Sequence, residues 1–155
     1  MQNKNFARAD SYAQFTAGFA SLNQLGFLRA LALKNSEGEI ISISKKVLST
    51  KFEKRRIELL TNLAGVNIPT ASAILTLIDP QNYGVIDIRV WQILYLYGAV
   101  KTKPRGTNFN FKNWYNYLMK IRYYARKFKV SAKDVERTLF FAHRNVQRGN
   151  LYKSK

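Results

Sequence analysis

The 155-residue chain has no cysteine and only one histidine, His143. The absence of cysteine excludes a disulfide, a thiolate zinc site, an iron–sulfur cluster and a thiol nucleophile. One histidine also argues against a histidine-rich metal site. We therefore expect chemistry that uses no resident metal and no cofactor.

Acidic residues are also scarce. Nine Asp and Glu stand against 26 Lys and Arg, which gives a formal net charge of +17. Such an excess predicts polyanionic partners rather than a particular fold. Residues 101–155 hold 15 of the basic side chains but only two of the acidic ones. This C-terminal third, with its basic helices, is therefore the expected electrostatic face.

Long hydrophobic runs are missing as well. No segment approaches the roughly 20 apolar residues of a membrane span, and the N-terminus lacks the apolar core of a signal peptide. We expect a cytoplasmic, monomeric protein without a membrane partner, associated with the nucleoid if bacterial. Hydrophobic residues still make up 46% of the chain, and this length fits a single domain over residues 1–155.

Helical spacing of apolar residues dominates the chain and predicts an all-α, compact helical bundle. Helices are expected in residues 10–33, from about residue 50, between Pro69 and Pro80, from residue 88 to Gly98, and in two segments after residue 110. A capping box is predicted at Ser131 and Asp134. The alternating "ISIS" of residues 41–44 leaves a short strand open as an alternative.

The stretch "LAGVNIPTA", residues 63–71, joins two of these helices by a very short turn. Gly65 would let the turn approach a phosphate closely, and the amides at the start of the second helix would face an anion. Those amides are predicted at Val66, Asn67 and Ile68, with Thr70 beside them. Asn67 is expected to adopt a left-handed backbone, which asparagine tolerates better than most residues.

This helical pair, at about residues 57–80, resembles the helix-hairpin-helix of the DNA glycosylase superfamily. The "IDIRV" of residues 86–90 is similar to the segment that holds the catalytic aspartate in that family. The resemblance implies a minimal single-domain glycosylase without an iron–sulfur cluster, acting on double-stranded DNA that contains a damaged or modified base. It also implies a structural monovalent cation at the hairpin.

Asp87 is the carboxylate that this resemblance implies for catalysis. A carboxylate near C1′ would stabilise the positive charge that develops on the sugar and orient the attacking water. The alternative is that Asp87 only caps the helix that begins at Ile88. Pro69 stands where bifunctional relatives have a lysine, which implies a monofunctional enzyme unless Lys45, Lys46 or Lys51 substitutes in space.

Further residues are candidates for contact with DNA. Arg89, beside Asp87, is one, and the basic loop and the penultimate helix supply Lys101, Lys103, Arg105, Arg126 and Lys127. The candidates for the base pocket are Trp91, Tyr123, Tyr124 and His143. The alternative interpretation is that Trp91 and Trp114 are core residues and that His143 has a structural role.

Two rival functions remain open at this stage. A DNA-binding module without catalysis would use the same hairpin and would be indifferent to Asp87. An RNA-binding protein would need only the high positive charge, and it would prefer structured RNA to duplex DNA.

Overall fold

A computed structural model of the chain describes residues 34–147, which contain six α-helices and no strand. The helices are α3 (Glu37–Ser49), α4 (Glu53–Thr61), α5 (Ile68–Ile78), α6 (Ile88–Leu96), α7 (Phe111–Phe128) and α8 (Ala132–Val146). The predicted all-α fold class is confirmed for this part of the chain. The helix expected in residues 10–33 and most of the C-terminal tail lie outside the described residues.

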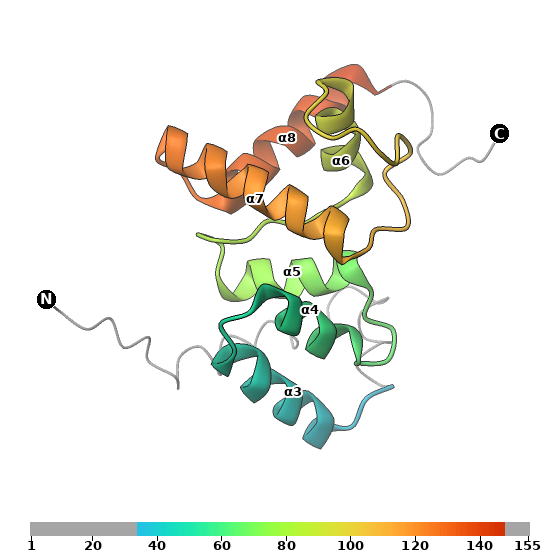
Figure 1. Ribbon diagram of the computed structural model, residues 1–155, viewed down its shortest axis with the longest axis vertical. Coiled ribbons are helices and arrows are strands. Elements are labelled where there is room, and N and C mark those ends of the chain that lie inside the picture. The colour runs from blue at the N-terminus through green and yellow to red at the C-terminus, as the bar shows by residue number, and fades with distance from the viewer. Residues whose placement is uncertain (1–33, 148–155) are drawn as a thin grey trace, which may run out of the picture.

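The helices form two groups, with α3 to α5 below and α6 to α8 above in Figure 1. In the first group α3 packs against α4 and α4 against α5; in the second, α8 packs against both α6 and α7. Helix α7 also contacts α4 and α5, so it connects the groups. Residues 79–87 run between α5 and α6 and bring the chain from one group to the other (Figure 1).

Helix α3 contains the "ISIS" segment, so the short strand considered for residues 41–44 is wrong. The physical reason lies just upstream. Ser36 and Glu39 form a complete capping box, which satisfies free amides at the helix start. Val47 and Ser44 are buried, and the Ser44 hydroxyl donates to the Ile40 carbonyl at 2.6 Å. A helix therefore accommodates the serines that alternate with isoleucine here.

The predicted ends of the other helices agree with the structure. Pro69 lies in the first turn of α5, and α5 ends two residues before Pro80. Gly98, with φ +70°, follows the end of α6. Ser131 and Asp134 form the predicted capping box of α8. Capping signals that are local in sequence were therefore sufficient to place these ends.

The core extends through both groups of helices, and its largest fully buried side chains come from α6 and α7. Trp91, Trp114 and Tyr117 are fully buried. The apolar face that helical spacing gives α7 is buried as a whole: Trp114, Tyr117, Leu118, Ile121 and Ala125. On α8, Val135 is buried, whereas Val146, the last residue of the helix, is 42% exposed.

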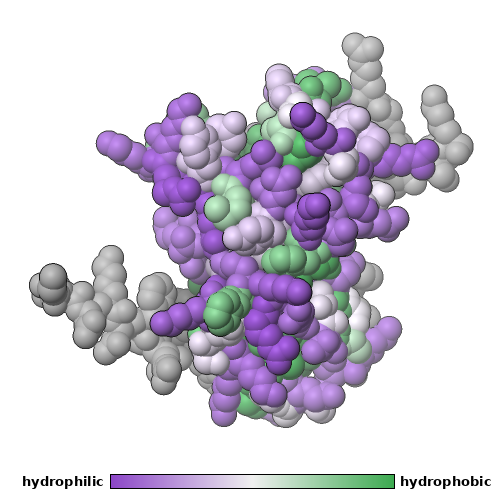
Figure 2. Space-filling model, viewed as in Figure 1, coloured by the Kyte–Doolittle hydropathy of each residue, from purple (hydrophilic) through white to green (hydrophobic). Residues whose placement is uncertain are grey.

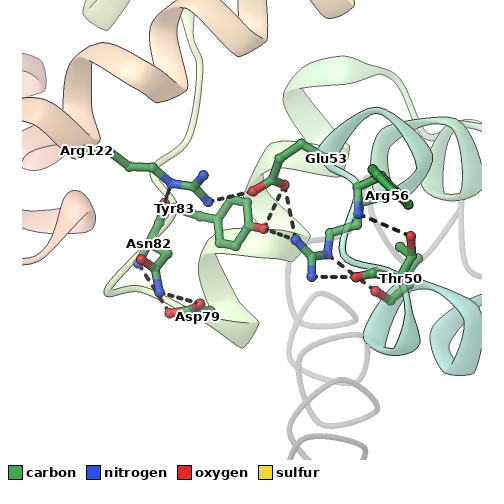
Figure 3. Close-up of polar contacts among 9 residues, drawn as sticks. Thr50, Glu53, Arg56, Asp79, Asn82, Tyr83 and Arg122 are labelled. Atoms are coloured by element: carbon green, nitrogen blue, oxygen red, sulfur yellow. Dashed lines mark hydrogen bonds and ion pairs between the residues drawn. The ribbon is translucent and has the colours of Figure 1, made fainter.

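Glu53 of α4 connects the two helix groups through polar contacts (Figure 3). One of its oxygens lies 2.8 Å from Nη2 of Arg122 on α7. The other accepts a hydrogen bond from the Tyr83 hydroxyl at 2.8 Å and lies 3.3 Å from Nη1 of Arg56. Arg122 also lies over the Tyr83 ring, with 4.8 Å to its centroid. The carboxylate is thus surrounded by two guanidinium groups and a phenol.

The surface is largely hydrophilic on the face in Figure 2, with separate hydrophobic patches. Within residues 34–147, no helix combines the length and the hydrophobicity that crossing a membrane requires.

Candidate functional site

The connection between α4 and α5 is short, and Gly65 within it has φ +80°. A glycine accepts this left-handed backbone without the strain that a side chain would cause. The Val66 amide donates to the Leu63 carbonyl at 3.1 Å. The prediction that Val66 presents its amide to an anion is therefore wrong, because the turn itself uses that amide.

Asn67 is the N-cap of α5 and has an extended backbone, with φ −98°. The expected left-handed conformation of Asn67 is wrong. Its side chain instead accepts hydrogen bonds from the amide and the hydroxyl of Thr70, at 3.0 and 2.9 Å. Among the described residues, no hydrogen-bond acceptor is found for the amides of Gly65, Asn67 or Ile68. These three amides remain candidates for contact with an anion at the start of α5.

Asp87 lies at the end of residues 79–87, which contacts from three helices hold in place. The Ile86 amide donates to the Ser72 hydroxyl of α5 at 3.1 Å, and Ile86 is fully buried. The Tyr117 hydroxyl of α7 donates to the Val85 carbonyl at 2.9 Å. Asp87 itself is the N-cap of α6 and accepts from the Val90 amide at 2.8 Å. The N-cap reading of Asp87 is confirmed, and its side chain is only half-buried.

A cavity of about 290 Å³ opens beside Asp87. The described residues that line it come from three separate parts of the chain: Pro69 of α5, Asp87 and Ile88 at the start of α6, and Gly106, Thr107, Asn108 and Phe109 of the basic loop. Asp87 is the only ionisable residue among them. The cavity thus joins the start of α5, the carboxylate and the loop in one place.

The basic loop is held against α6 by a glycine. Gly106 has φ +68°, and a methyl group added there would lie 2.9 Å from the Ile88 carbonyl oxygen. The loop is closed by hydrogen bonds from the Gly106 amide and the Lys103 ammonium, which donate to the carbonyls of Lys103 and Asn108 respectively. Only glycine fits this close approach, so residues 106–109 are fixed beside Asp87.

Burial raises the pKa of Asp87 above its usual range. Hydrogen bonds from the amides of Val90 and Arg89 and the positive charge of Arg89 lower the pKa in part. The Arg89 guanidinium lies over the Phe140 ring, 5.1 Å from its centroid. Asp87 forms no ion pair within residues 34–147.

Helix α8 contributes a second carboxylate, Glu136, which sequence reasoning missed. Burial and the negative charge of Asp87 raise its pKa to about 7, against the opposing effects of Lys133 and Arg137. A methyl group added at Gly84 would lie 2.8 Å from Cβ of Glu136, so Glu136 packs directly on the segment that leads to Asp87. The only sequence signal was its spacing of seven residues from His143, which places both on one face of α8.

The four residues predicted for the base pocket do not line this cavity. Trp91 has no exposed surface, and its indole donates to the Thr102 carbonyl at 3.0 Å. His143 is buried, and its Nε2 lies 2.7 Å from Oε1 of Gln92, while burial lowers its pKa. Trp91 and Trp114 are thus core residues, which confirms the alternative interpretation of these two tryptophans. Phe109, which sequence reasoning did not select, is the aromatic residue beside Asp87.

The tyrosines of α7 lie elsewhere. Tyr123 is 54% exposed, and Tyr124 is half-buried and stacks on Phe128 at 6.1 Å between centroids. Arg126 and Lys127 on the same half of α7 are exposed. Arg126 borders two other cavities, of about 590 and 570 Å³, on the side of residues 79–83. Helix α7 therefore offers a basic and aromatic surface that is separate from the cavity beside Asp87.

Lys101 and Arg105 are exposed and Lys103 is half-buried, so the loop that lines the cavity also presents cations around it. No cluster of three metal-binding side chains occurs in the described part of the chain. In the α4–α5 connection, the carbonyls of Leu63 and Ala64 already accept hydrogen bonds from Val66 and Asn35. The monovalent cation that the resemblance implies at the hairpin stays a prediction.

Comparisons with protein-family models, curated proteins and solved structures found no match to this chain.

Proposed function

We propose that this protein is a DNA glycosylase of the helix-hairpin-helix type, which removes a damaged or modified base by hydrolysing its N-glycosidic bond. The observation that supports this most is the cavity in which Asp87, Pro69 and residues 106–109 meet. The start of α5, the Asp87 carboxylate and the basic loop meet there, and together they offer contacts for a phosphate and a negative charge for the sugar.

The Asp87 carboxylate would stabilise the positive charge that develops on the sugar during the reaction. As the bond between base and sugar breaks, positive charge develops on the deoxyribose, and a fixed anion beside it lowers the energy of that state. Asp87 suits this role because its helix cap fixes its orientation and because no cation neutralises it by direct contact within the described residues. The same carboxylate can orient or deprotonate the attacking water.

Pro69 supports a monofunctional enzyme. It borders the same cavity as Asp87, at the position where a lysine nucleophile would stand in a bifunctional relative. Proline has no amine with which to form a Schiff base. Strand cleavage would then require a separate alkali treatment of the abasic product.

DNA would approach along the start of α5 and the basic loop. The amides of Gly65, Asn67 and Ile68 are available to one phosphate, and Lys101 and Arg105 are exposed nearby on the loop that borders the cavity. Each phosphate contact releases counterions, so binding should weaken steeply with salt. Arg126 and Lys127 would extend this basic surface along α7.

One observation favours the second candidate, a DNA-binding module without catalysis. The Val90 amide already gives Asp87 a structural partner at 2.8 Å, so the cap alone accounts for an aspartate at this position. Such a module would bind DNA with the same salt dependence and would tolerate loss of the charge on Asp87.

A single pair of variants separates the two candidates. Asn is as good an N-cap as Asp, so Asp87→Asn keeps the cap and removes the charge, whereas Asp87→Ala removes both. Excision would be measured on end-labelled duplexes that each hold one modified base, with and without alkali. We expect alkali-dependent cleavage by the wild type and at least about a 100-fold slower rate for Asp87→Asn.

The exposed Glu58 of α4 supplies the matched control, since Glu58→Gln also removes one negative charge. It should leave excision unchanged. Equal excision by wild type and Asp87→Asn would refute the catalytic role of Asp87. If no duplex is cut while all variants bind DNA alike, the DNA-binding module is the better description for that panel.

A further inference from the structure

Helix α8 presents one continuous face to the site. Glu136, Phe140 and His143 follow one another at intervals of four and three residues, so they lie along one side of the helix. Phe140 lies against Arg89, and His143 contacts Gln92 of α6. The packing of α6 on α8 therefore sets Glu136 at the level of residues 84–87, just before α6 begins.

Two further contacts place Glu136 against this segment. Gly84 packs on Cβ of Glu136 so closely that an added methyl group would lie 2.8 Å away, and 3.1 Å from the Tyr117 hydroxyl. The Tyr117 hydroxyl donates a hydrogen bond to the Val85 carbonyl at 2.9 Å, and the backbone of Val85 donates one to the Glu136 carboxylate. The segment that ends at Asp87 is thus held between α7 and α8.

We propose that Glu136 is a positioning residue for Asp87, which fixes residues 84–87 against α8 and supplies a second negative charge to the site when it ionises. This inference rests on the proposed function, since it assigns Glu136 a part in the same reaction. Glu136 does not line the cavity beside Asp87, so it acts through Asp87 and through its field.

The two carboxyl groups would ionise in sequence. Asp87 ionises first, and its charge together with burial raises the pKa of Glu136 to about 7. Burial raises the pKa of Tyr117 far above its usual range, so it stays protonated. The other charged or titratable groups that face this pair are Lys133 and Arg137, which act on Glu136, and Arg89 and His143, which act on Asp87.

The charge of the pair therefore changes from one negative charge to two across the neutral range. A second fixed anion behind Asp87 would further stabilise positive charge on the sugar. We expect the single-turnover rate of excision to rise as the pH passes through 7. The rise should be roughly tenfold at most, because Glu136 lies behind Asp87 and does not line the cavity.

A titration of the full-length protein, without DNA, tests the coupling directly. The carboxyl carbons of Asp and Glu would be followed by NMR in the wild type, in Asp87→Asn and in the control Glu58→Gln. We expect Glu136 to titrate near 7 in the wild type and the control, and at clearly lower pH in Asp87→Asn. Titration of wild-type Glu136 in the ordinary carboxyl range, or no change in Asp87→Asn, would overturn the proposal.

The rate profile then tests the consequence. On the duplex that the wild type cuts best, Glu136→Gln should lose the rise near pH 7 and keep the loss of activity at low pH that reports Asp87. Glu136→Asp retains a titratable carboxyl group and should restore a rise near neutrality. If the excision rate of Glu136→Gln still rises near pH 7, or is lowered equally at all pH values, Glu136 has only a structural role and the proposal is refuted.

The two experiments fail separately. If Glu136 titrates near 7 but no duplex is cut at any pH, the proposed function fails for that panel and the effect of Glu136 on a rate fails with it. If excision occurs but Glu136 titrates normally, the glycosylase proposal stands and the role of Glu136 is refuted.

Discussion

Two carboxylate regions of this molecule contrast in how their charge is compensated. Around Glu53, two guanidinium groups and the Tyr83 hydroxyl contact both oxygens (Figure 3). Asp87 and Glu136 are also partly buried, but within residues 34–147 neither has a cation in ion-pair contact. Both instead accept backbone hydrogen bonds.

The difference distinguishes a structural use of buried charge, at Glu53, from the functional use that we propose for Asp87 and Glu136. A neutralised carboxylate fixes the helices around it, as Glu53 joins α4 to α7 and to residues 79–87. An uncompensated pair costs stability, and proteins retain such costs mainly at functional sites. The pKa of Tyr83, raised to about 12 by burial and by Glu53, shows how enclosed the compensated region is.

The largest expected effect comes from breaking the compensated region. Glu53→Gln would leave the guanidinium groups of Arg56 and Arg122 without their anion in a mostly buried position, where the side chain of Glu53 is only 16% exposed. We expect a loss of about 3 kcal/mol in the free energy of unfolding, measured by urea denaturation.

Glu58→Gln is again the control, because Glu58 pairs with Lys54 and Arg55 on the surface, and it should change stability by less than about 0.5 kcal/mol. Equal losses in both variants would show that the Glu53 contacts are no more structural than a surface ion pair.

A second effect concerns the close approach of the loop to α6. Gly106→Ala places a methyl group 2.9 Å from the Ile88 carbonyl at a residue with φ +68°. Steric strain and the left-handed backbone together should cost about 2 kcal/mol. The loop must then move away from Asp87, so excision should fall by more than stability alone explains.

Gly98→Ala is the matched control, since Gly98 has φ +70° with open space around it. It should reproduce the backbone strain, measured as a shift in urea midpoint, without the loss of excision. A similar loss of excision in both variants would show that the close approach of the loop to α6 has no specific role in excision.

The uncompensated pair should make stability depend on pH in an unusual direction. The pKa of Glu136 is higher in the folded state, at about 7, than its ordinary value of 4.5. Its contribution is therefore fully present below about pH 4.5 and is lost as the pH rises through 7. Glu136→Gln should raise stability at pH 8 by about 1 kcal/mol, after allowance for solvent screening, with little change at pH 5.

Urea midpoints measured at the two pH values would check this difference, and Glu58→Gln should show none. A Glu136→Gln variant that is equally less stable at both values would indicate that packing on Gly84, rather than charge, is the main role of the side chain.

The sequence predicted the helices because their signals are local. The capping box of α8, the prolines around α5 and the apolar face of α7 each lie within one helix. The exception, the alternation in residues 41–44, was a short pattern that a strong cap at Ser36 overrode. Local signals also identified Asp87 as an N-cap.

The site was only partly predictable, since its cavity depends on contacts between distant segments. Pro69 and Asp87 were both singled out in the sequence, but nothing local shows that Phe109 would lie beside them. Glu136 lies 49 residues from Asp87 in the chain, and only the packing of α8 brings it to residues 84–87. Its one sequence signal, the spacing of seven residues from His143, does not point to Asp87.

The smallest change in stability should accompany the largest change in activity. Asp87→Asn keeps an N-cap for the Val90 amide. It also removes a partly buried charge, and the raised pKa of Asp87 in the wild type shows that burying this charge costs free energy. We expect a free energy of unfolding within about 0.5 kcal/mol of the wild type at pH 7, or slightly above it, whereas Asp87→Ala should lose about 1 kcal/mol with the cap.

Thermal unfolding of both variants beside the wild type would decide the point. Because acid protonates Asp87, the difference between wild type and Asp87→Asn should shrink as the pH falls, whereas the deficit of Asp87→Ala should persist. A marked loss of stability in Asp87→Asn would mean that the charge itself supports the fold. In that case Asp87 would belong with Glu53 among the structural carboxylates, and the contrast between the two regions would disappear.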